Sequence, residues 1–118
     1  MATIRITNLR LRAIIGTNDW ERETLQDILI NITIEFDAAK PAQSDNLHDT
    51  VDYKKITKRI IKFVEASQFF LLEKLAEEVL NLIMEDQKIQ AATVRIDKPH
   101  ALRFADSVAL EITRRKEF

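Results

Sequence analysis

The chain has 118 residues, of which 46% are hydrophobic and 31% charged, and its formal net charge is −1. This length and composition predict one globular domain, residues 1–118, and the lack of net positive charge argues against a nucleic-acid partner. The absence of cysteine excludes disulfides, thiolate nucleophiles and thiolate metal sites, and the single glycine excludes a glycine-rich phosphate loop.

The first third of the chain has the alternating pattern of two β-strands. Apolar side chains occupy alternate positions in residues 3–15, and a slip of one position near Thr7 and Asn8 predicts a β-bulge. Residues 27–38 alternate strictly, so the two runs predict a long antiparallel hairpin. Its connection begins at Gly16 and is longer than a tight turn needs, which is typical of a functional loop.

Two amphipathic helices are predicted in the middle of the chain. A polar connector over residues 38–50, with room for a short helical turn, leads to a helix over about 53–66 that Asp52 can cap. A second helix covers about 71–86. The exposed side of the first is basic and that of the second acidic, so we expect antiparallel packing with these edges close together.

The last two predicted strands flank a polar segment. Residues 94–97 and 107–113 alternate, and Pro99 favours an extended conformation at Lys98. The Lys98 amine is therefore expected at the end of a strand. The residues alone leave two interpretations open, a basic surface hairpin or a catalytic lysine beside an anion-binding loop. The basic side chains of this segment are Lys98, His100 and Arg103.

The order ββααββ predicts a two-layer α+β domain, with a four-stranded antiparallel sheet and two antiparallel helices on one face. Such a sheet has two unpaired edges, and its isoleucine-rich first pair carries neither proline nor an inward charge to protect them. We therefore expect subunits to pair edge to edge into a closed homo-oligomeric ring, since closure removes every edge.

Three further side chains are candidates for chemistry, although each also has a structural explanation. Glu21 could be an ordinary loop charge, and Tyr53 an aromatic residue at the edge of the core. Glu73 could be a carboxylate favoured by the dipole of the helix that begins there. The two histidines, His48 and His100, are too few for a three-histidine zinc site, so no metal is expected.

No apolar run approaches the ~20 residues that span a bilayer, and the N-terminus lacks the apolar core of a secretory signal. The sequence therefore predicts a cytoplasmic protein without a membrane partner.

Five segments together span nearly the whole chain: LRLRAIIGTNDWE (9–21), QDILINITI (26–34), TVDYKKIT (50–57), FFLLEKLAEEVL (69–80) and IDKPHALRFADSV (96–108). Through these segments the sequence resembles the dihydroneopterin aldolase family. The last segment is most like family members that epimerise dihydroneopterin triphosphate, whereas DWE in the first is closer to some aldolases. The resemblance implies the tunnelling fold, in which four subunits close a β-barrel and two such rings stack into an octamer.

The resemblance also implies a role for each candidate residue. Lys98 matches the catalytic lysine of the family, and Glu21 matches the loop glutamate that supports this lysine and the side chain of the substrate. Tyr53, supplied by an adjacent subunit, would pack near the pterin and help proton transfer. Glu73, with the backbone of Leu72, would bind the pterin ring, because a carboxylate accepts two N–H bonds in a fork.

The implied activity is epimerisation at C2′ of 7,8-dihydroneopterin triphosphate by retro-aldol and aldol steps. No cofactor is expected, because the C=N bond of the dihydropterin accepts the electrons. The triphosphate needs positive partners, for which His100 and Arg103 are candidates. Two alternatives stay open: a dihydroneopterin aldolase that releases glycolaldehyde in folate synthesis, and a non-catalytic ring protein that binds pterins.

Overall fold

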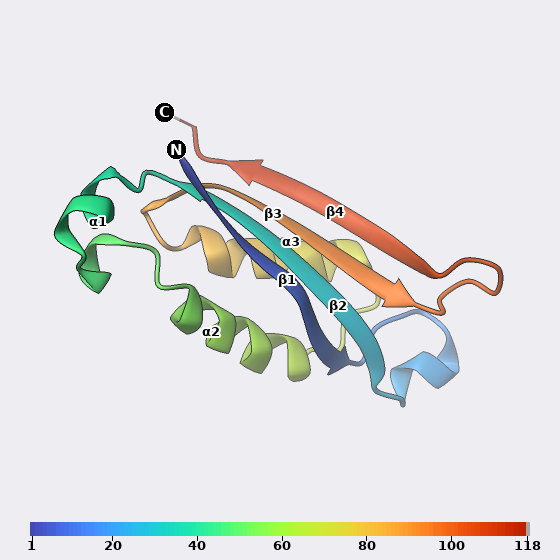
Figure 1. The fold of residues 1–118 in the computed structure, drawn as a ribbon. Coiled ribbons are helices and arrows are strands. Elements are labelled where there is room, and N and C mark those ends of the chain that lie inside the picture. The colour runs from blue at the N-terminus through green and yellow to red at the C-terminus, as the bar shows by residue number, and fades with distance from the viewer. Residues whose placement is uncertain (118) are drawn as a thin grey trace.

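A computed structural model describes residues 1–117 as a four-stranded sheet with helices on one face (Figure 1). The sequence prediction of a two-layer α+β domain is confirmed. The elements in chain order are β1 (Ala2–Ala13), a 3-10 turn (Asp19–Arg22), β2 (Gln26–Phe36), α1 (Ala39–Ser44), a 3-10 turn (Leu47–Asp49), α2 (Tyr53–Glu65), α3 (Leu72–Met84), β3 (Ile89–Pro99) and β4 (Ser107–Arg115).

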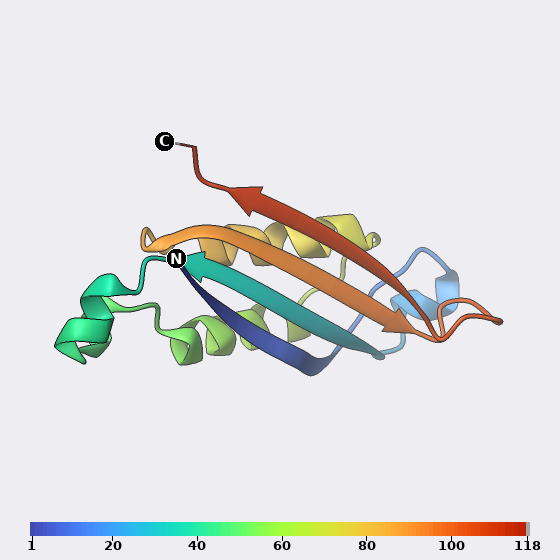
Figure 2. The ribbon, with the colours of Figure 1, turned by 45° about the horizontal axis from the view of Figure 1, so that its top comes forward.

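The sheet is antiparallel throughout, in the order β1-β2-β3-β4, so β1 and β4 are its edges (Figure 2). The predicted bulge is confirmed, because the register of β1 on β2 shifts between Ile6 and Leu9. At the shift Asn8 has a left-handed φ of 54°, and its N–H donates to Asn31 Oδ1 at 2.8 Å. The Asn31 amide thus satisfies a backbone group that the bulge removes from the ladder.

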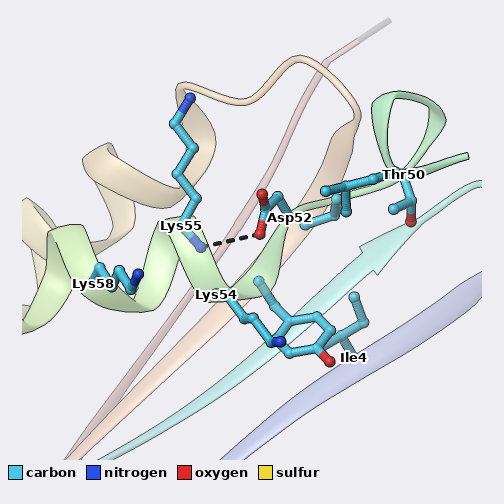
Figure 3. A pocket seen from close by; sticks show the side chains of 9 residues that line it. Ile4, Thr50, Asp52, Lys54, Lys55 and Lys58 are labelled. Atoms are coloured by element: carbon cyan, nitrogen blue, oxygen red, sulfur yellow. Dashed lines mark hydrogen bonds between the residues drawn. The ribbon is translucent and has the colours of Figure 1, made fainter.

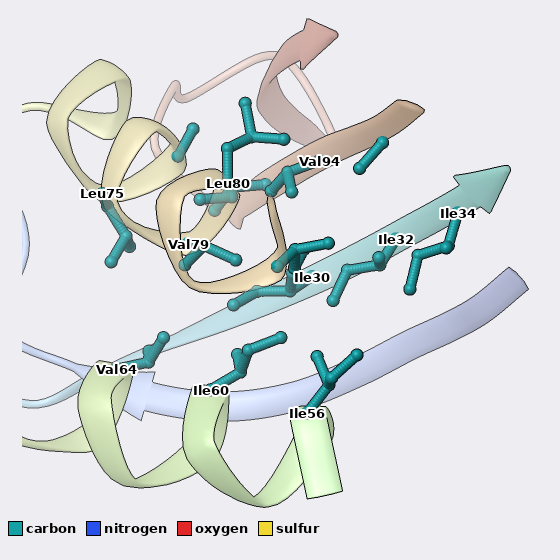
Figure 4. Close-up of a cluster of buried hydrophobic side chains, with 14 of the residues drawn as sticks. Ile30, Ile32, Ile34, Ile56, Ile60, Val64, Leu75, Val79, Leu80 and Val94 are labelled. Atoms are coloured by element: carbon teal, nitrogen blue, oxygen red, sulfur yellow. The ribbon is translucent and has the colours of Figure 1, made fainter. Parts of the chain in front are cut away.

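The core lies between the sheet and the helices (Figure 4). The strict alternation of β2 places every second side chain on this face, from Ile28 to Phe36. Burying each isoleucine contributes roughly 1.5–3 kcal/mol, which makes this strand the main apolar surface for both helices. The other face of the sheet is polar. It carries Asn31, Thr33, Thr93, Arg95 and Glu111 around a shallow hollow.

The two long helices lie antiparallel across this core (Figure 1). Asp52 caps α2 as predicted, since its carboxylate accepts the N–H of Lys55 at 3.1 Å. The expected meeting of basic and acidic helix edges occurs at one pair, Arg59 with Glu85 at 2.6 Å. Glu77 of α3 instead binds Arg114 of β4, and Glu78 pairs with Lys74 of its own helix.

Two features differ from the sequence interpretation. The first long loop contains a 3-10 turn, Asp19–Arg22, and β3 begins at Ile89 rather than near residue 94.

None of the helices in residues 1–117 has both the length and the apolar character that a membrane-spanning helix needs.

Candidate active site

The Lys98 amine lies at the end of β3, as predicted, and contacts the carboxylate of Glu21. The two side chains are 14% and 5% exposed. Glu21 is the only charged residue that is buried in the described part of the chain. Burying a charge without a partner is costly, so Lys98 is the partner that makes this position tolerable.

The loop geometry divides the two oxygens of the Glu21 carboxylate between two partners. The backbone N–H and the side-chain amide of Asn18 both donate to Oε1, at 3.1 and 2.8 Å. Oε2 is left to Lys98. The 3-10 turn of Asp19–Arg22 therefore aims one carboxylate oxygen at the end of β3.

Gly16 provides the space for this carboxylate. Its φ is +130°, a conformation that other residues rarely adopt, and an added Cβ would overlap the carboxyl atoms of Glu21. It is also the only glycine of the chain. The one position where the backbone needs a glycine thus lies against the buried acid.

The environment of Glu21 keeps it ionised. Burial raises the pKa of the Glu21 carboxyl, but hydrogen bonds from Lys98 and Asn18 and the charge of Lys98 outweigh burial, so the pKa lies below the ordinary 4.5. Near neutral pH a full negative charge therefore faces the Lys98 nitrogen.

Arg22 joins this loop to the segment before α3. Its guanidinium donates to the carbonyl of Gly16 and to that of Phe69, both at 3.0 Å, and also to that of Gln68. It lies 3.9 Å from the ring centroid of Phe70. Residues 16–22 and 66–71 are therefore held together.

Glu73 lies in the first turn of α3, directly after this segment, at the same end of the molecule as the 3-10 turn and the end of β3 (Figure 1). Its side chain is exposed, and that of Leu72 is half-buried. The residue before the helix, Leu71, has an apolar side chain that cannot cap it, so backbone N–H groups of the first turn stay available.

The two residues predicted to bind the phosphates, His100 and Arg103, are in the loop that follows Lys98. His100 has a left-handed φ of 61°, and its N–H donates to the carbonyl of Asp106 at 3.3 Å. Arg103 is exposed, and its guanidinium lies 5.6 Å from the ring centroid of Phe104. Both side chains are open to solvent beside the Lys98 position.

Tyr53 is at the other end of the molecule. It begins α2, and its half-exposed side chain lines a cavity of about 590 Å³ with Ile4, Leu47 and neighbouring lysines. In Figure 1 the start of α2 and the end of β3 lie toward opposite ends of a molecule 52 Å long. One chain therefore does not bring Tyr53 to Lys98, and a site that uses both needs two chains.

The structure thus joins Lys98 to Glu21 and places the remaining candidates, apart from Tyr53, at the same end of the fold. The sequence analysis missed Asn18 and Arg22, and the only signal for them was the isolated glycine two residues before Asn18. Among residues 1–117 there is no cluster of three or more histidine, cysteine or acidic side chains that could hold a metal ion. An amine fixed by a buried carboxylate is suited to moving a proton.

The family model described as dihydroneopterin aldolase matches residues 4–113 of the chain. A dihydroneopterin triphosphate 2′-epimerase of Pseudomonas aeruginosa is 45% identical over 112 residues, which cover 95% of this chain and 91% of that protein. The epimerase of the same name from Escherichia coli is 46% identical over 112 residues, covering 95% and 93%.

A solved structure matches the whole fold. The crystal structure of Escherichia coli dihydroneopterin aldolase in complex with neopterin has a TM-score of 0.91 and 31% sequence identity, and the match covers 97% of this chain and 99% of that one. The similarity in sequence and the similarity in structure therefore extend over nearly the same length.

Proposed function

The chain belongs to the dihydroneopterin aldolase family, and from that premise we propose that it epimerises 7,8-dihydroneopterin triphosphate at C2′, giving 7,8-dihydromonapterin triphosphate. The observation that carries the proposal is the Lys98 amine held on the buried Glu21 carboxylate at the end of β3. The relatives that are 45% and 46% identical bear the epimerase name, and the aldolase structure is 31% identical.

In the proposed mechanism Lys98 takes the proton of the 2′-hydroxyl through a water molecule. The C1′–C2′ bond breaks, its electrons pass into the C=N bond of the dihydropterin, and C2′ becomes an aldehyde. The aldehyde turns over and is attacked again by C1′, and the proton returns to the new 2′-oxygen. Only the neutral amine can take this proton, so Lys98 must first release the proton that it carries in the ion pair with Glu21. Glu21 fixes the amine and stabilises the ammonium ion that forms again when the hydroxyl proton is taken up.

Substrate binding is divided among the remaining candidates. We assign the pterin ring to the Glu73 carboxylate and the Leu72 backbone, because the ring offers N–H donors and Glu73 is exposed at the start of α3. Tyr53 of a second subunit would pack near the pterin and assist proton transfer. His100 and Arg103, in the exposed loop after Lys98, would contact the phosphates.

A homo-oligomeric ring follows from this assignment and from the sheet edges. The edge strands β1 and β4 keep half-exposed apolar side chains, which pairing with another chain would cover. Tetramer and octamer are both compatible with this proposal, and a cytoplasmic location stays a prediction from the sequence.

The aldolase reaction is the second candidate, because its first step is the same. If the aldehyde leaves and C1′ is protonated, the product is that of an aldolase. The match to an aldolase structure with bound neopterin supports this alternative. Retention of the aldehyde is the difference between the two activities.

The test is to incubate the wild-type protein with dihydroneopterin triphosphate and with dihydroneopterin, and to measure the 2′-epimer by chiral chromatography and the free aldehyde by a coupled assay. We expect the epimer of the triphosphate to exceed released aldehyde, and Lys98→Ala to abolish both. Aldehyde release without epimer would identify an aldolase. Pterin binding without turnover would identify a non-catalytic binding protein.

A further inference from the structure

We propose that Lys54 and Lys58, on the first turns of α2, form a polyphosphate-binding subsite beside Tyr53. The inference rests on the proposed function, because Tyr53 would enter the site of a neighbouring subunit and the two lysines would accompany it. The substrate class that the subsite selects is a pterin with a polyphosphate on its side chain.

The subsite is a cavity of about 590 Å³ between α2, β1 and the turn before α2. Its floor is apolar and its rim basic. In Figure 3 the Lys54 side chain extends toward Ile4 of β1, whereas Lys55 points to the other side of the helix. The lining residues are Ile4, Leu47, Thr50, Val51, Asp52, Tyr53, Lys54, Lys55 and Lys58.

The positive charge at this cavity is not neutralised by the chain itself. Asp52 is its only acidic lining residue, and that carboxylate is committed to the Lys55 N–H at 3.1 Å. None of the three lysines forms a salt bridge with any residue of the described chain, 1–117. Arg59, the next basic residue, is paired with Glu85 at 2.6 Å.

Lys54 and Lys58 are the pair that an anion can bridge. They are four residues apart and share one face of α2, where like charges repel by a few tenths of a kcal/mol. Lys55 also lines a second cavity, with the acidic residues Glu85 and Asp86, so its charge is shared between the two cavities. A phosphate chain between Lys54 and Lys58 would replace their repulsion with charge-assisted hydrogen bonds.

The subsite adds to the two residues beside Lys98, His100 and Arg103, that are proposed to bind the phosphates. A polyphosphate carries several negative charges, more than the exposed His100 and Arg103 can balance. When Tyr53 of one subunit reaches the pterin bound by another, the substrate side chain lies between two basic surfaces. One is the loop after Lys98, and the other is the α2 face of the neighbour.

The first test compares KM for dihydroneopterin triphosphate and for dihydroneopterin in the variants Lys54→Gln, Lys58→Gln and their combination. We expect KM of the double variant for the triphosphate to rise about tenfold, with a much smaller rise for dihydroneopterin. The rise should shrink in high salt, which screens exposed charges. The matched control is Lys62→Gln, which removes the same charge from α2 outside this cavity.

The second test is independent of turnover. Inorganic tripolyphosphate binding to the full-length protein, measured by calorimetry, should weaken about tenfold in the double variant and stay unchanged in Lys62→Gln. Equal binding by wild type and double variant, or equal rises of KM for both substrates, would overturn the subsite. If wild-type protein binds tripolyphosphate through these lysines but does not epimerise the triphosphate, the proposed function fails and the subsite stands.

Discussion

Glu21 is a buried acid whose position depends on its immediate neighbours. Asn18 fixes one carboxylate oxygen, Lys98 takes the other, and Gly16 leaves the space that the carboxyl group occupies. Removing Asn18 or Lys98 would leave the buried charge without a full set of partners, which is costly, and a side chain at Gly16 would displace the carboxyl group. The stability of the loop and the position of the Lys98 amine are therefore coupled.

Gly16→Ala should disturb this position directly. The added Cβ overlaps the Glu21 carboxyl and the backbone keeps an unfavourable positive φ, so we expect a loss of about 1–3 kcal/mol in the free energy of unfolding. Turnover should also fall, because the displaced Glu21 carboxylate no longer fixes the Lys98 amine. Thr17→Ala, at the exposed neighbouring position, is the control. Wild-type stability and turnover in Gly16→Ala would contradict the packing described for Glu21.

The ionisation of Glu21 predicts a pH dependence of stability. Its pKa is lowered in the folded chain and returns to about 4.5 on unfolding, so its stabilisation is complete above that pH and is lost as the pH falls through the folded pKa. Chemical unfolding between about pH 7 and pH 3 measures this. Glu21→Gln should be less stable near neutrality, and the difference from wild type should narrow in acid. A constant difference would argue against the ion pair.

At the scale of elements, the strands, helices and their caps follow from local physics. The alternation in β2, the Asp52 cap and the extended Lys98–Pro99 end of β3 depend on residues close in sequence, and each was predictable. The start of β3 was not, because Ala91 and Ala92 are both buried and break the alternation. The pairing of Lys98 with Glu21 joins residues far apart in the chain and came only from the family resemblance.

Arg22 is the clearest contact that no local pattern could reveal. It connects loops that lie more than 40 residues apart in the sequence and binds only backbone carbonyls and an aromatic ring. A carbonyl gives no sequence signal, because every residue has one. In the structure the same contact fixes the segment that leads to Glu73 against the loop that carries Glu21.

Arg22→Met should loosen both loops together. It keeps an unbranched apolar side chain but loses every guanidinium donor, which we expect to lower the free energy of unfolding by about 1–3 kcal/mol. Amide hydrogen exchange should accelerate in residues 16–22 and 66–71 and not in β2. Arg5→Met, on the exposed surface of β1, is the matched control. Faster exchange in only one loop would show that Arg22 does not join them.

At the scale of the whole molecule, the proposed site needs residues from more than one chain. The start of α2, which carries Tyr53, and the end of β3, which carries Lys98, lie toward opposite ends of the fold, which is 52 Å long (Figure 1). A complete proposed site therefore combines the β3 end of one subunit with the α2 start of another. The cavity with Lys54 and Lys58 belongs to the second of these surfaces.

Mixing two inactive variants tests this arrangement. Lys98→Ala and Tyr53→Ala should each be nearly inactive alone, but equal amounts reassembled by denaturation and refolding should regain about a quarter of wild-type activity under random mixing of subunits. The expected fraction is a quarter because each intact site needs one specific subunit on each side. Separately refolded variants, combined afterwards without subunit exchange, are the control. No recovery in verified mixed oligomers would contradict a site that combines Lys98 of one subunit with Tyr53 of another.

The polar face of the sheet has a consequence for such a ring. Helices cover the opposite face, so curling the sheets with their helices outward would turn Asn31, Thr93 and Arg95 toward the axis. The centre of the ring would then be a water-filled channel lined by amides, hydroxyls and charged groups. A small barrel formed by one chain has close-packed apolar side chains in that place. The ring would be held together by strand pairing between subunits. Blocking one edge strand would therefore dissociate the ring and leave each protomer folded.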